Sequence, residues 1–421
     1  MCGIAGALHQ DGEPVSPVIV GRMADALAHR GPDDQGVFVD GAFGVGHRRL
    51  AILDLSSAGH QPMVTPDGRF VLSYNGELYN FAELRAELEA AGWRFRSRTD
   101  SEVVLYALVE WGAAALQRFN GMFALALWDK TSRELLLARD RYGIKPLYYA
   151  TDDKRVLFAS EIKALYAHPG FCPGIDMAGL REYMSFQNFI SDRTLFDGVN
   201  MLEAGTWCRI TAGGATRSER YWDFSFEEPQ EAADEAALHE ELLRLFRQAV
   251  QRQLVSDVPL GAYLSGGVDS GSVTAIAAAQ IPNLTTFTVG FDLNSASGLE
   301  LGFDERPASE YMSYVLQTEH YEMVLKAGDM ERCMRSLVWH LEEPRVGQSY
   351  PNYYAARLAS RFNKVVLSGT GGDELFGGYP WRYYRAAVND DFDHYVDKYY
   401  GFWQRLLSDD VALEVMGPVA G

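Results

Sequence analysis

The sequence predicts two successive domains, a layered α/β or α+β domain and then an α/β domain with a parallel sheet. The chain has 421 residues, enough for two or three domains. Short apolar strands with interspersed helices occupy the first 210 residues, whereas strands alternate regularly with helices after residue 237. Residues 211–236, between these regions, are polar and acidic and predict a linker.

In the first region, three apolar segments have the length of strands, at 70–74, 122–128 and 134–139. Residues 129–133 predict the hairpin connection between the last two. Apolar residues recur at spacings of three and four in three predicted helices, at 15–29, 80–92 and 101–118. Gly92 is expected to end the second helix. Sheets interleaved with helices indicate a layered domain.

The second region opens with an amphipathic helix predicted at 237–253. Four short apolar strands are then expected, at 259–264, 284–291, 321–325 and 364–367. An Ala-rich helix that ends near Gln280 follows the first strand, and further helices fill the other gaps. Such alternation builds βαβ units, which predict a parallel sheet.

Charge, cysteine content and hydropathy disfavour several classes of protein. The chain has 38 Lys and Arg against 57 Asp and Glu, a net charge of −19, which disfavours a nucleic-acid groove because such grooves neutralise phosphates. Its four cysteines, Cys2, Cys172, Cys208 and Cys333, lack metal-type spacing and suit a reducing cytoplasm. No apolar run reaches the ~18 residues of a membrane span. The N-terminus lacks the features of a signal peptide.

Cys2 is the first candidate catalytic residue. Removal of Met1 would leave a thiol and a free α-amine on the same residue. The amine, with an ordinary pKa of about 7.7–8.0, would serve as a general base for the thiol at neutral pH. Small neighbours such as Gly3 would let a substrate approach the backbone closely. Taken alone, however, an ordinary second residue is the simpler interpretation of this position.

Later segments contain the residue types that a glutamine amide hydrolase needs. Arg49 offers a guanidinium fork for the α-carboxylate, and Asp100, assisted by Glu77, offers negative charge for the α-ammonium. The Asn75 amide and the Gly76 backbone N–H are candidate donors to the oxyanion formed by thiol attack. Two simpler interpretations stay open, because Asn-Gly also favours hairpin turns and Arg49 could be a surface charge.

Five segments, 2–6, 29–34, 49–54, 74–77 and 98–102, together resemble the class II glutamine amidotransferase domain of the N-terminal-nucleophile (Ntn) hydrolases. The resemblance implies a four-layer αββα sandwich over residues 2–210, with Cys2, Asn75 and Gly76 as catalytic residues. It implies glutamine binding by Arg49, Leu50, Ala51, Ile52, Leu53, Asn75, Gly76, Glu77 and Asp100. Residues 29–33 resemble the loop that closes over the thiol.

A glycine-rich loop, residues 265–270, follows a predicted strand and opens a helix. Its small residues and the helix N-terminus would present backbone N–H groups to an anion, with hydroxyl donors from Ser265 and Ser270. Asp269 would repel phosphate unless a cation intervened, and therefore indicates Mg²⁺. No Lys follows, so the loop is not the Gly-x4-Gly-Lys-Ser/Thr type. In isolation, a plain strand-to-helix turn explains it equally well.

A second glycine-rich loop lies within 367–379 and carries Asp373. Two such loops at the carboxyl ends of parallel strands predict a ligand crevice. Asp269 and Asp373 are therefore candidates to share Mg²⁺ on a pyrophosphate. Four aromatic residues follow this loop, Tyr379, Trp381, Tyr383 and Tyr384, for which core packing is favoured over a role at the acceptor site.

Residues 237–421 resemble the PP-loop ATP pyrophosphatase domain, in which ATP adenylates a carboxylate. The resemblance implies ATP binding by Leu264, Ser265, Gly266, Gly267, Asp269, Ser270, Val289, Ser368 and Gly369. Both halves together resemble the glutamine-hydrolysing asparagine synthetases. That family uses glutamine, aspartate, ATP and Mg²⁺. It forms a γ-glutamyl thioester and β-aspartyl-AMP, passes ammonia through a tunnel, and is commonly dimeric.

Two departures from this family keep other functions open. The second loop commonly carries Glu where this chain has Thr370, so an amidotransferase acting on a different carboxylate is one alternative. The family's synthetase domain also continues well past a point like Gly421 and carries a Lys of the acceptor site there, so an incomplete domain is expected. The second alternative is therefore a glutaminase-competent regulatory protein without synthetase activity.

Overall fold

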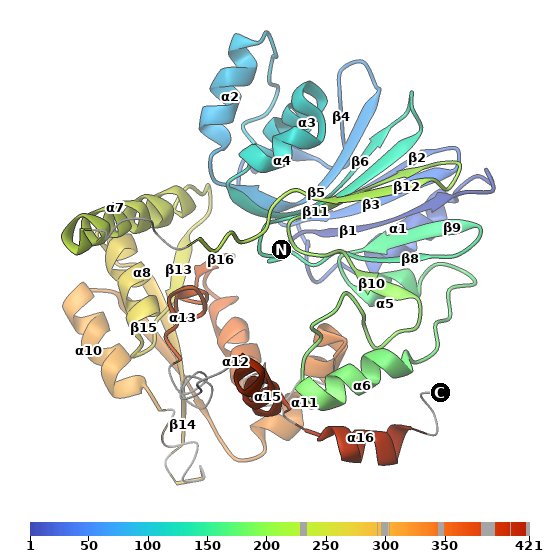
Figure 1. The fold of residues 1–421 in the computed structure, drawn as a ribbon. Coiled ribbons are helices and arrows are strands. Elements are labelled where there is room, and N and C mark those ends of the chain that lie inside the picture. The colour runs from blue at the N-terminus through green and yellow to red at the C-terminus, as the bar shows by residue number, and fades with distance from the viewer. Residues whose placement is uncertain are drawn as a thin grey trace. The chain divides into compact units, whose positions relative to one another are not determined.

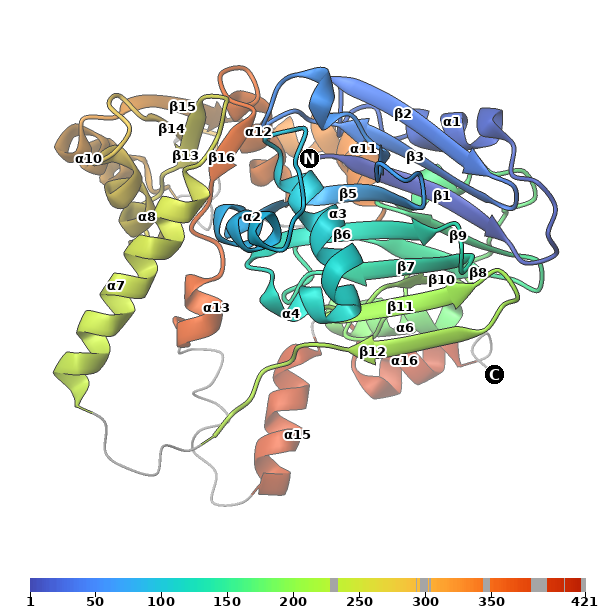
Figure 2. The ribbon, with the colours of Figure 1, turned by 90° about the horizontal axis from the view of Figure 1, so that it is seen from above.

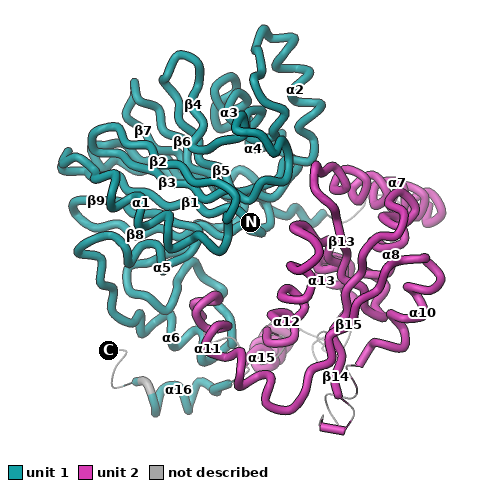
Figure 3. Tube along the Cα trace, turned by 180° about the vertical axis from the view of Figure 1, so that it is seen from behind, with its two compact units in different colours: residues 1–227, 405–421 teal, residues 228–404 magenta. Residues whose placement is uncertain are grey.

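The structure is a computed structural model that describes residues 1–227, 234–292, 294–295, 302, 304–343, 349–379, 392–404 and 406–417. The chain divides into two compact units (Figure 3), one of residues 1–227 and 405–421 and one of residues 228–404. Three of the aromatic residues singled out above, Trp381, Tyr383 and Tyr384, lie outside the described residues.

The first unit contains two six-stranded antiparallel sheets. One has the order β10-β8-β9-β1-β3-β2, from β1 (Gly3–His9), β2 (Asp34–Asp40), β3 (Phe43–Arg49), β8 (Tyr148–Thr151), β9 (Arg155–Ala159) and β10 (Val199–Met201). The other has the order β12-β11-β7-β6-β5-β4, from β4 (Met63–Val64), β5 (Phe70–Leu78), β6 (Gly121–Asp129), β7 (Glu134–Arg139), β11 (Thr206–Thr211) and β12 (Thr216–Arg220).

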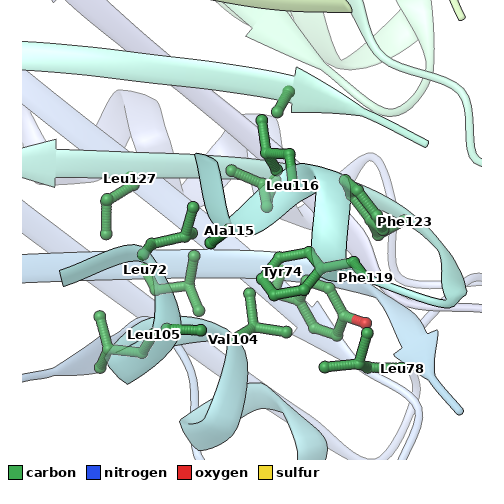
Figure 4. Close-up of a cluster of buried hydrophobic side chains, with 14 of the residues drawn as sticks. Leu72, Tyr74, Leu78, Val104, Leu105, Ala115, Leu116, Phe119, Phe123 and Leu127 are labelled. Carbon is green, nitrogen blue, oxygen red and sulfur yellow. The ribbon is translucent and has the colours of Figure 1, made fainter. Parts of the chain in front are cut away.

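Helices cover the outer face of each sheet, as Figure 1 shows. They are α1 (Pro17–Asp25) and α5 (Ile162–Leu165) on the β1 sheet, and α2 (Phe81–Ala90), α3 (Asp100–Trp111) and α4 (Ala115–Arg118) on the β5 sheet. A buried cluster joins α2, α3 and α4 to β5 and β6 (Figure 4). Between the sheets, Phe43 stacks on Trp128 with ring centroids 4.4 Å apart. The predicted αββα sandwich is therefore confirmed.

Apolar side chains alternate between the two faces of β1, so the strand can be buried between the second sheet and the helices α1 and α5. Ile4 and Leu8 pack into the cluster between the sheets, whereas Ala5 and Ala7 pack toward α1 and α5. This is the period of two expected for a strand buried on both faces. Cys2 immediately precedes β1, which pairs with β9 on one side and β3 on the other. The backbone of Cys2 is therefore anchored to an interior strand of the sheet.

Two details of the first unit differ from the sequence prediction. The helix predicted at 101–118 ends early, because Gly112 adopts a positive φ of 59° after α3, and a short 3₁₀ turn separates it from α4. The sheet also continues past the predicted boundary at residue 210. Gly213 and Gly214, interpreted as the start of the linker, form the turn between β11 and β12, with Gly214 at φ 88°.

The second unit contains a four-stranded parallel sheet of order β15-β14-β13-β16, as predicted. Its strands are β13 (Leu260–Tyr263), β14 (Thr285–Phe291), β15 (Glu319–Leu325) and β16 (Val365–Leu367). In Figures 1 and 2, α8 (Val268–Ala278) and α10 (Arg306–Leu316) cover one face, and α11 (Asp329–Leu341) and α12 (Ser349–Ala359) cover the other. The strand order reverses between β13 and β16, where such sheets bind ligands.

The remaining helices complete each unit. In the second unit, α7 (Glu235–Gln253) packs on α8, and α13 (Gly372–Phe376) and α15 (Phe392–Trp403) follow the sheet. In the first unit, α16 (Asp409–Met416) packs on α6 (Met177–Phe186), so the end of the predicted second domain groups with the first unit. Among the described residues, no helix is both long enough and apolar enough to cross a membrane.

Candidate active sites

The thiol of Cys2 lies against the segment that follows β3. The Leu50 backbone N–H donates to Cys2 Sγ at 3.3 Å. Burial raises the pKa of this thiol, and the Leu50 hydrogen bond partly opposes that effect. Burial, aided by the charges of Arg30 and Lys145 and opposed by that of Cys2, lowers the pKa of the chain's terminal amine, on Met1, to about 5. These surroundings favour a neutral amine beside Cys2, which a general base requires.

Asn75 and Gly76 lie within β5 and pair with Ala124 and Phe123 of β6, so the hairpin-turn interpretation is wrong. Asn75 is 1% exposed, and its Nδ2 has no hydrogen-bond partner among the described residues. A buried donor without a partner costs roughly 1–3 kcal/mol, which indicates an acceptor supplied by a ligand. A Cβ at Gly76 would lie 2.5 Å from the Met122 carbonyl oxygen, so only glycine fits there.

The half-buried Glu77 and the buried Asp100 form an acidic pair near the end of β5. Burial raises the pKa of Asp100 to about 6, although its Oδ2 accepts hydrogen bonds from Leu78 N at 2.8 Å and the Tyr74 hydroxyl at 3.3 Å. Burial and the charge of Asp100 raise the pKa of Glu77 well above its usual value. A cationic group bound between them would relieve this repulsion and stabilise both carboxylates in their ionised forms.

Arg49 is 6% exposed, so the interpretation as a surface charge is wrong. Its Nη1 donates to the Ser56 carbonyl at 3.0 Å, and its Nη2 donates to the carbonyls of Leu53 and Asp54 at 3.1 and 2.6 Å. Arg49 therefore shapes the segment that contains the predicted glutamine-binding residues Leu50, Ala51, Ile52 and Leu53. Binding of a substrate carboxylate by this guanidinium stays a prediction.

Lys145 was missed by sequence reasoning. It is buried, which lowers its pKa, and it interacts electrostatically with Arg30, Glu77 and Cys2. Its loop is fixed by the wholly buried carboxylate of Asp140, which accepts hydrogen bonds from the backbone N–H groups of Tyr142, Ile144 and Lys145. A single Lys after a turn looks like a surface residue, so no sequence signal identified it.

In the second unit, the loop after β13 is held by its own hydroxyl groups. Ser265 Oγ lies 2.8 Å from Ser270 Oγ, and it accepts a hydrogen bond from Gly267 N at 3.1 Å. Ser270 Oγ also accepts from Ser265 N at 3.1 Å. Gly266 and Gly267 lead directly into the N-terminus of α8. Backbone N–H groups at a helix N-terminus favour the binding of an anion.

The two glycine-rich loops lie against each other. A Cβ at Gly369 would lie 2.4 Å from the backbone nitrogen of Ser270, and Asp373 N donates to Asp269 Oδ2 at 2.9 Å. In the described part of the chain, no group of three or more His, Cys, Asp or Glu side chains could hold a metal. Mg²⁺ takes one or two carboxylates together with substrate phosphates and water, so Asp269 and Asp373 offer a suitable kind of ligand, and their sharing of one ion stays a prediction.

Three other predicted ATP-binding residues have different surroundings. Leu264 is buried at the end of β13, and its carbonyl accepts a hydrogen bond from the Thr288 hydroxyl. The hydroxyl of Ser368 lies 2.8 Å from that of Thr370 on an exposed part of the second loop. Val289 instead packs against the buried cluster of Leu325, Cys333 and Tyr354. Any contact of Val289 with a nucleotide would therefore fall to its backbone.

Comparison with known proteins agrees with this division of the chain. Residues 1–222 match the glutamine amidotransferase domain family, and residues 241–418 match the asparagine synthase family. The putative glutamine-hydrolysing asparagine synthetase 2 of Methanocaldococcus jannaschii is 34% identical, over 90% of this chain and 76% of that protein. The chain belongs to the glutamine-hydrolysing asparagine synthetase family.

Other members of this family are longer. Asparagine synthetase 1 of Bacillus subtilis is 35% identical, over 90% of this chain and 59% of its own length. A putative asparagine synthetase of Mycobacterium tuberculosis is 38% identical, over 90% and 60%. The chain thus spans about three fifths of these two relatives. Among solved structures, glutamine phosphoribosylpyrophosphate amidotransferase of B. subtilis matches 68% of this chain and 65% of its own, at 20% identity and a TM-score of 0.40.

Proposed function

We propose that the protein makes asparagine from aspartate, with glutamine as nitrogen donor and ATP as energy source. The observation that carries the proposal is the buried Asn75 Nδ2, which has no hydrogen-bond partner among the described residues and lies in the same unit as Cys2 and the acidic pair. The Asn75 donor suits the side-chain amide oxygen of glutamine, the Cys2 thiol suits its amide carbon, and the carboxylates of Asp100 and Glu77 suit its α-ammonium. Family membership of both halves supports the same reaction.

In the first half-reaction, Met1 has been removed and the α-amine of Cys2 takes the thiol proton. The thiolate attacks the side-chain amide carbon of glutamine, and the Asn75 amide and Gly76 N–H donate to the resulting oxyanion. Arg49 binds the α-carboxylate, and Asp100 with Glu77 binds the α-ammonium. The protonated amine returns its proton to the leaving nitrogen, which releases ammonia and a γ-glutamyl thioester. Water then cleaves the thioester to glutamate.

In the second half-reaction, the two loops of the second unit hold ATP through backbone N–H groups and the hydroxyls of Ser265, Ser270 and Ser368. The β-carboxylate of aspartate attacks the α-phosphorus, and pyrophosphate leaves. Ammonia then displaces AMP from β-aspartyl-AMP and gives asparagine. Asp269 and Asp373 would hold Mg²⁺, which neutralises charge on the pyrophosphate when it is bound.

Release of pyrophosphate tests this function. The protein is given ATP, Mg²⁺ and glutamine, with aspartate or without an acceptor, and pyrophosphate, glutamate and asparagine are measured. Aspartate-dependent pyrophosphate with matching asparagine is the expected result. Glutamate formation without aspartate-dependent pyrophosphate would contradict it. That outcome would favour a different acceptor, for which Thr370 is the motivating residue, or a protein that only hydrolyses glutamine.

Two further properties form part of the proposal. Cys2, Cys172, Cys208 and Cys333 are all free in the structure, which supports a reducing, cytoplasmic location. A homodimer is expected from the family resemblance. Light scattering of the purified chain at micromolar concentration would measure its mass directly, and a monomer would contradict this expectation.

A further inference from the structure

The buried carboxylate of Glu161 is linked to the backbone of Cys2 through Arg30. Glu161 lies two residues after the end of β9 and immediately precedes α5. Its Oε2 lies 2.9 Å from His29 Nε2, its Oε1 accepts from Arg30 Nη1 at 2.8 Å, and Lys163 Nζ donates to Oε2. Three cationic or potentially cationic groups thus converge on one carboxylate, and the proposed chemistry of Cys2 uses none of them.

Arg30 connects this carboxylate to the nucleophile. While Nη1 is held by Glu161, its Nε donates to the Cys2 carbonyl at 2.8 Å. The terminal amine of Met1 donates to the Arg30 carbonyl at 3.3 Å, and Arg30 Nη2 lies 3.8 Å from the Met1 sulfur. Removal of Met1 would take away that sulfur contact. The guanidinium would then keep Glu161 on one side and the Cys2 backbone on the other.

The positive charges around Glu161 keep its carboxylate ionised, which strengthens its hydrogen bond with Arg30. Burial alone would raise the pKa of Glu161, but the hydrogen bond from His29 and the charges of Arg30 and Lys163 hold it at about 2. Glu161 is therefore ionised throughout the neutral range. Arg30 in turn lowers the pKa of the neighbouring terminal amine. A cation held at this point would act in the same direction on the α-amine of Cys2 once Met1 is removed.

We propose that Glu161 is a positioning residue for the glutamine half-reaction, which acts through Arg30 to orient the backbone and α-amine of Cys2. This inference rests on the proposed role of Cys2 as nucleophile. Glu161 fixes one edge of the guanidinium, so the other edge can hold the Cys2 carbonyl in a single place. A nucleophile displaced by about 1 Å can lose up to about 100-fold in rate.

Glu161→Gln is the first test, because it keeps the side-chain shape and removes the charge. The kcat for glutamine hydrolysis is expected to fall about 10- to 100-fold. The KM for glutamine is expected to stay within about twofold, because Arg49, Glu77 and Asp100 are unchanged. Asp129→Asn is the matched control. Asp129 also has a pKa of about 2, held down by the Arg69 hydrogen bond, and it has no contact with Arg30.

A double-mutant cycle with Arg30→Lys tests whether Glu161 acts through Arg30. Lysine keeps the charge but cannot bridge Glu161 and Cys2 in the same way. The double variant is expected to be no slower than Arg30→Lys alone, whereas multiplied losses would overturn the proposal. If Glu161→Gln does not fold, Arg30→Lys must still lower kcat without raising KM, and an unchanged kcat would overturn the proposal.

The pH profile of thiol alkylation by iodoacetamide provides a readout that general destabilisation would not move. Its midpoint is expected to shift in Glu161→Gln and to stay unchanged in Asp129→Asn, because Glu161 would no longer hold the Arg30 charge beside the α-amine that takes the thiol proton. If the wild-type protein had no glutaminase activity, the proposed role of Cys2 would be wrong. An active wild type with an unaffected Glu161→Gln variant would remove only the role of Glu161.

Discussion

The two units prepare their candidate sites in different ways. In the first unit, buried and half-buried side chains supply the charges and donors: Asn75 and Glu77 lie on β5, and Asp100 lies at the start of α3. In the second unit, short loops of small residues supply backbone N–H groups, and their side chains mainly hold the loops together. The first site should therefore be sensitive to changes of charge and the second to changes of volume.

The substitution with the largest expected effect should abolish the activity of the first unit and leave that of the second unit intact. Cys2→Ala removes the nucleophile and should lower glutamine hydrolysis by roughly 10⁴-fold or more. Pyrophosphate release with ammonia in place of glutamine should persist, because the loops of the second unit are unchanged. Parallel assays with glutamine and with ammonium chloride measure both. Loss of both activities would show that the substitution acts through folding, and the assignment of Cys2 would fail.

A smaller loss is expected from the oxyanion donor. Asn75→Ala should lower kcat for glutamine hydrolysis about 10²- to 10³-fold with little change in KM, since the amide acts on charge that develops during attack. Asn80→Ala is a suitable control, because the side-chain amide of Asn80 bonds to the backbone of Arg118 and Asn120 near α2. A rise in KM with an unchanged kcat would instead place Asn75 in ground-state binding.

A single methyl group should be enough to disturb the second site. Gly369→Ala would place a Cβ 2.4 Å from Ser270 N, so the loops would have to separate. Pyrophosphate release should fall about 10-fold or more, since the phosphate-binding N–H groups are displaced, while glutamine hydrolysis stays intact. Gly401→Ala in α15 is the control, because its added Cβ would meet no atom of the described residues within 4 Å beyond its own helix backbone. Equal effects of both substitutions would contradict the volume argument.

Motifs with local backbone consequences could be predicted from the sequence, and isolated buried charges could not. The loop at 265–270 and the strand around Asn75 stand out because small residues follow or interrupt apolar runs. Glu161 and Lys145 are ordinary charged residues in the sequence, and only tertiary packing buries them. The Gly213-Gly214 pair was misinterpreted as a linker because a hairpin turn and a linker use the same residues.

The smallest effect tests whether buried charge governs the first site. The pKa of Asp100 is raised to about 6, so it is protonated below that pH and ionised above it. Only the ionised form attracts the α-ammonium of glutamine, so the KM for glutamine should rise about tenfold as pH falls from 7 to 5. Initial rates against glutamine concentration at each pH measure this. In Asp100→Asn, KM should be high already at pH 7 and nearly independent of pH. A flat profile in the wild type would mean that Glu77 alone carries the ammonium contact, and that Asp100 serves only to accept the hydrogen bonds of Leu78 and Tyr74.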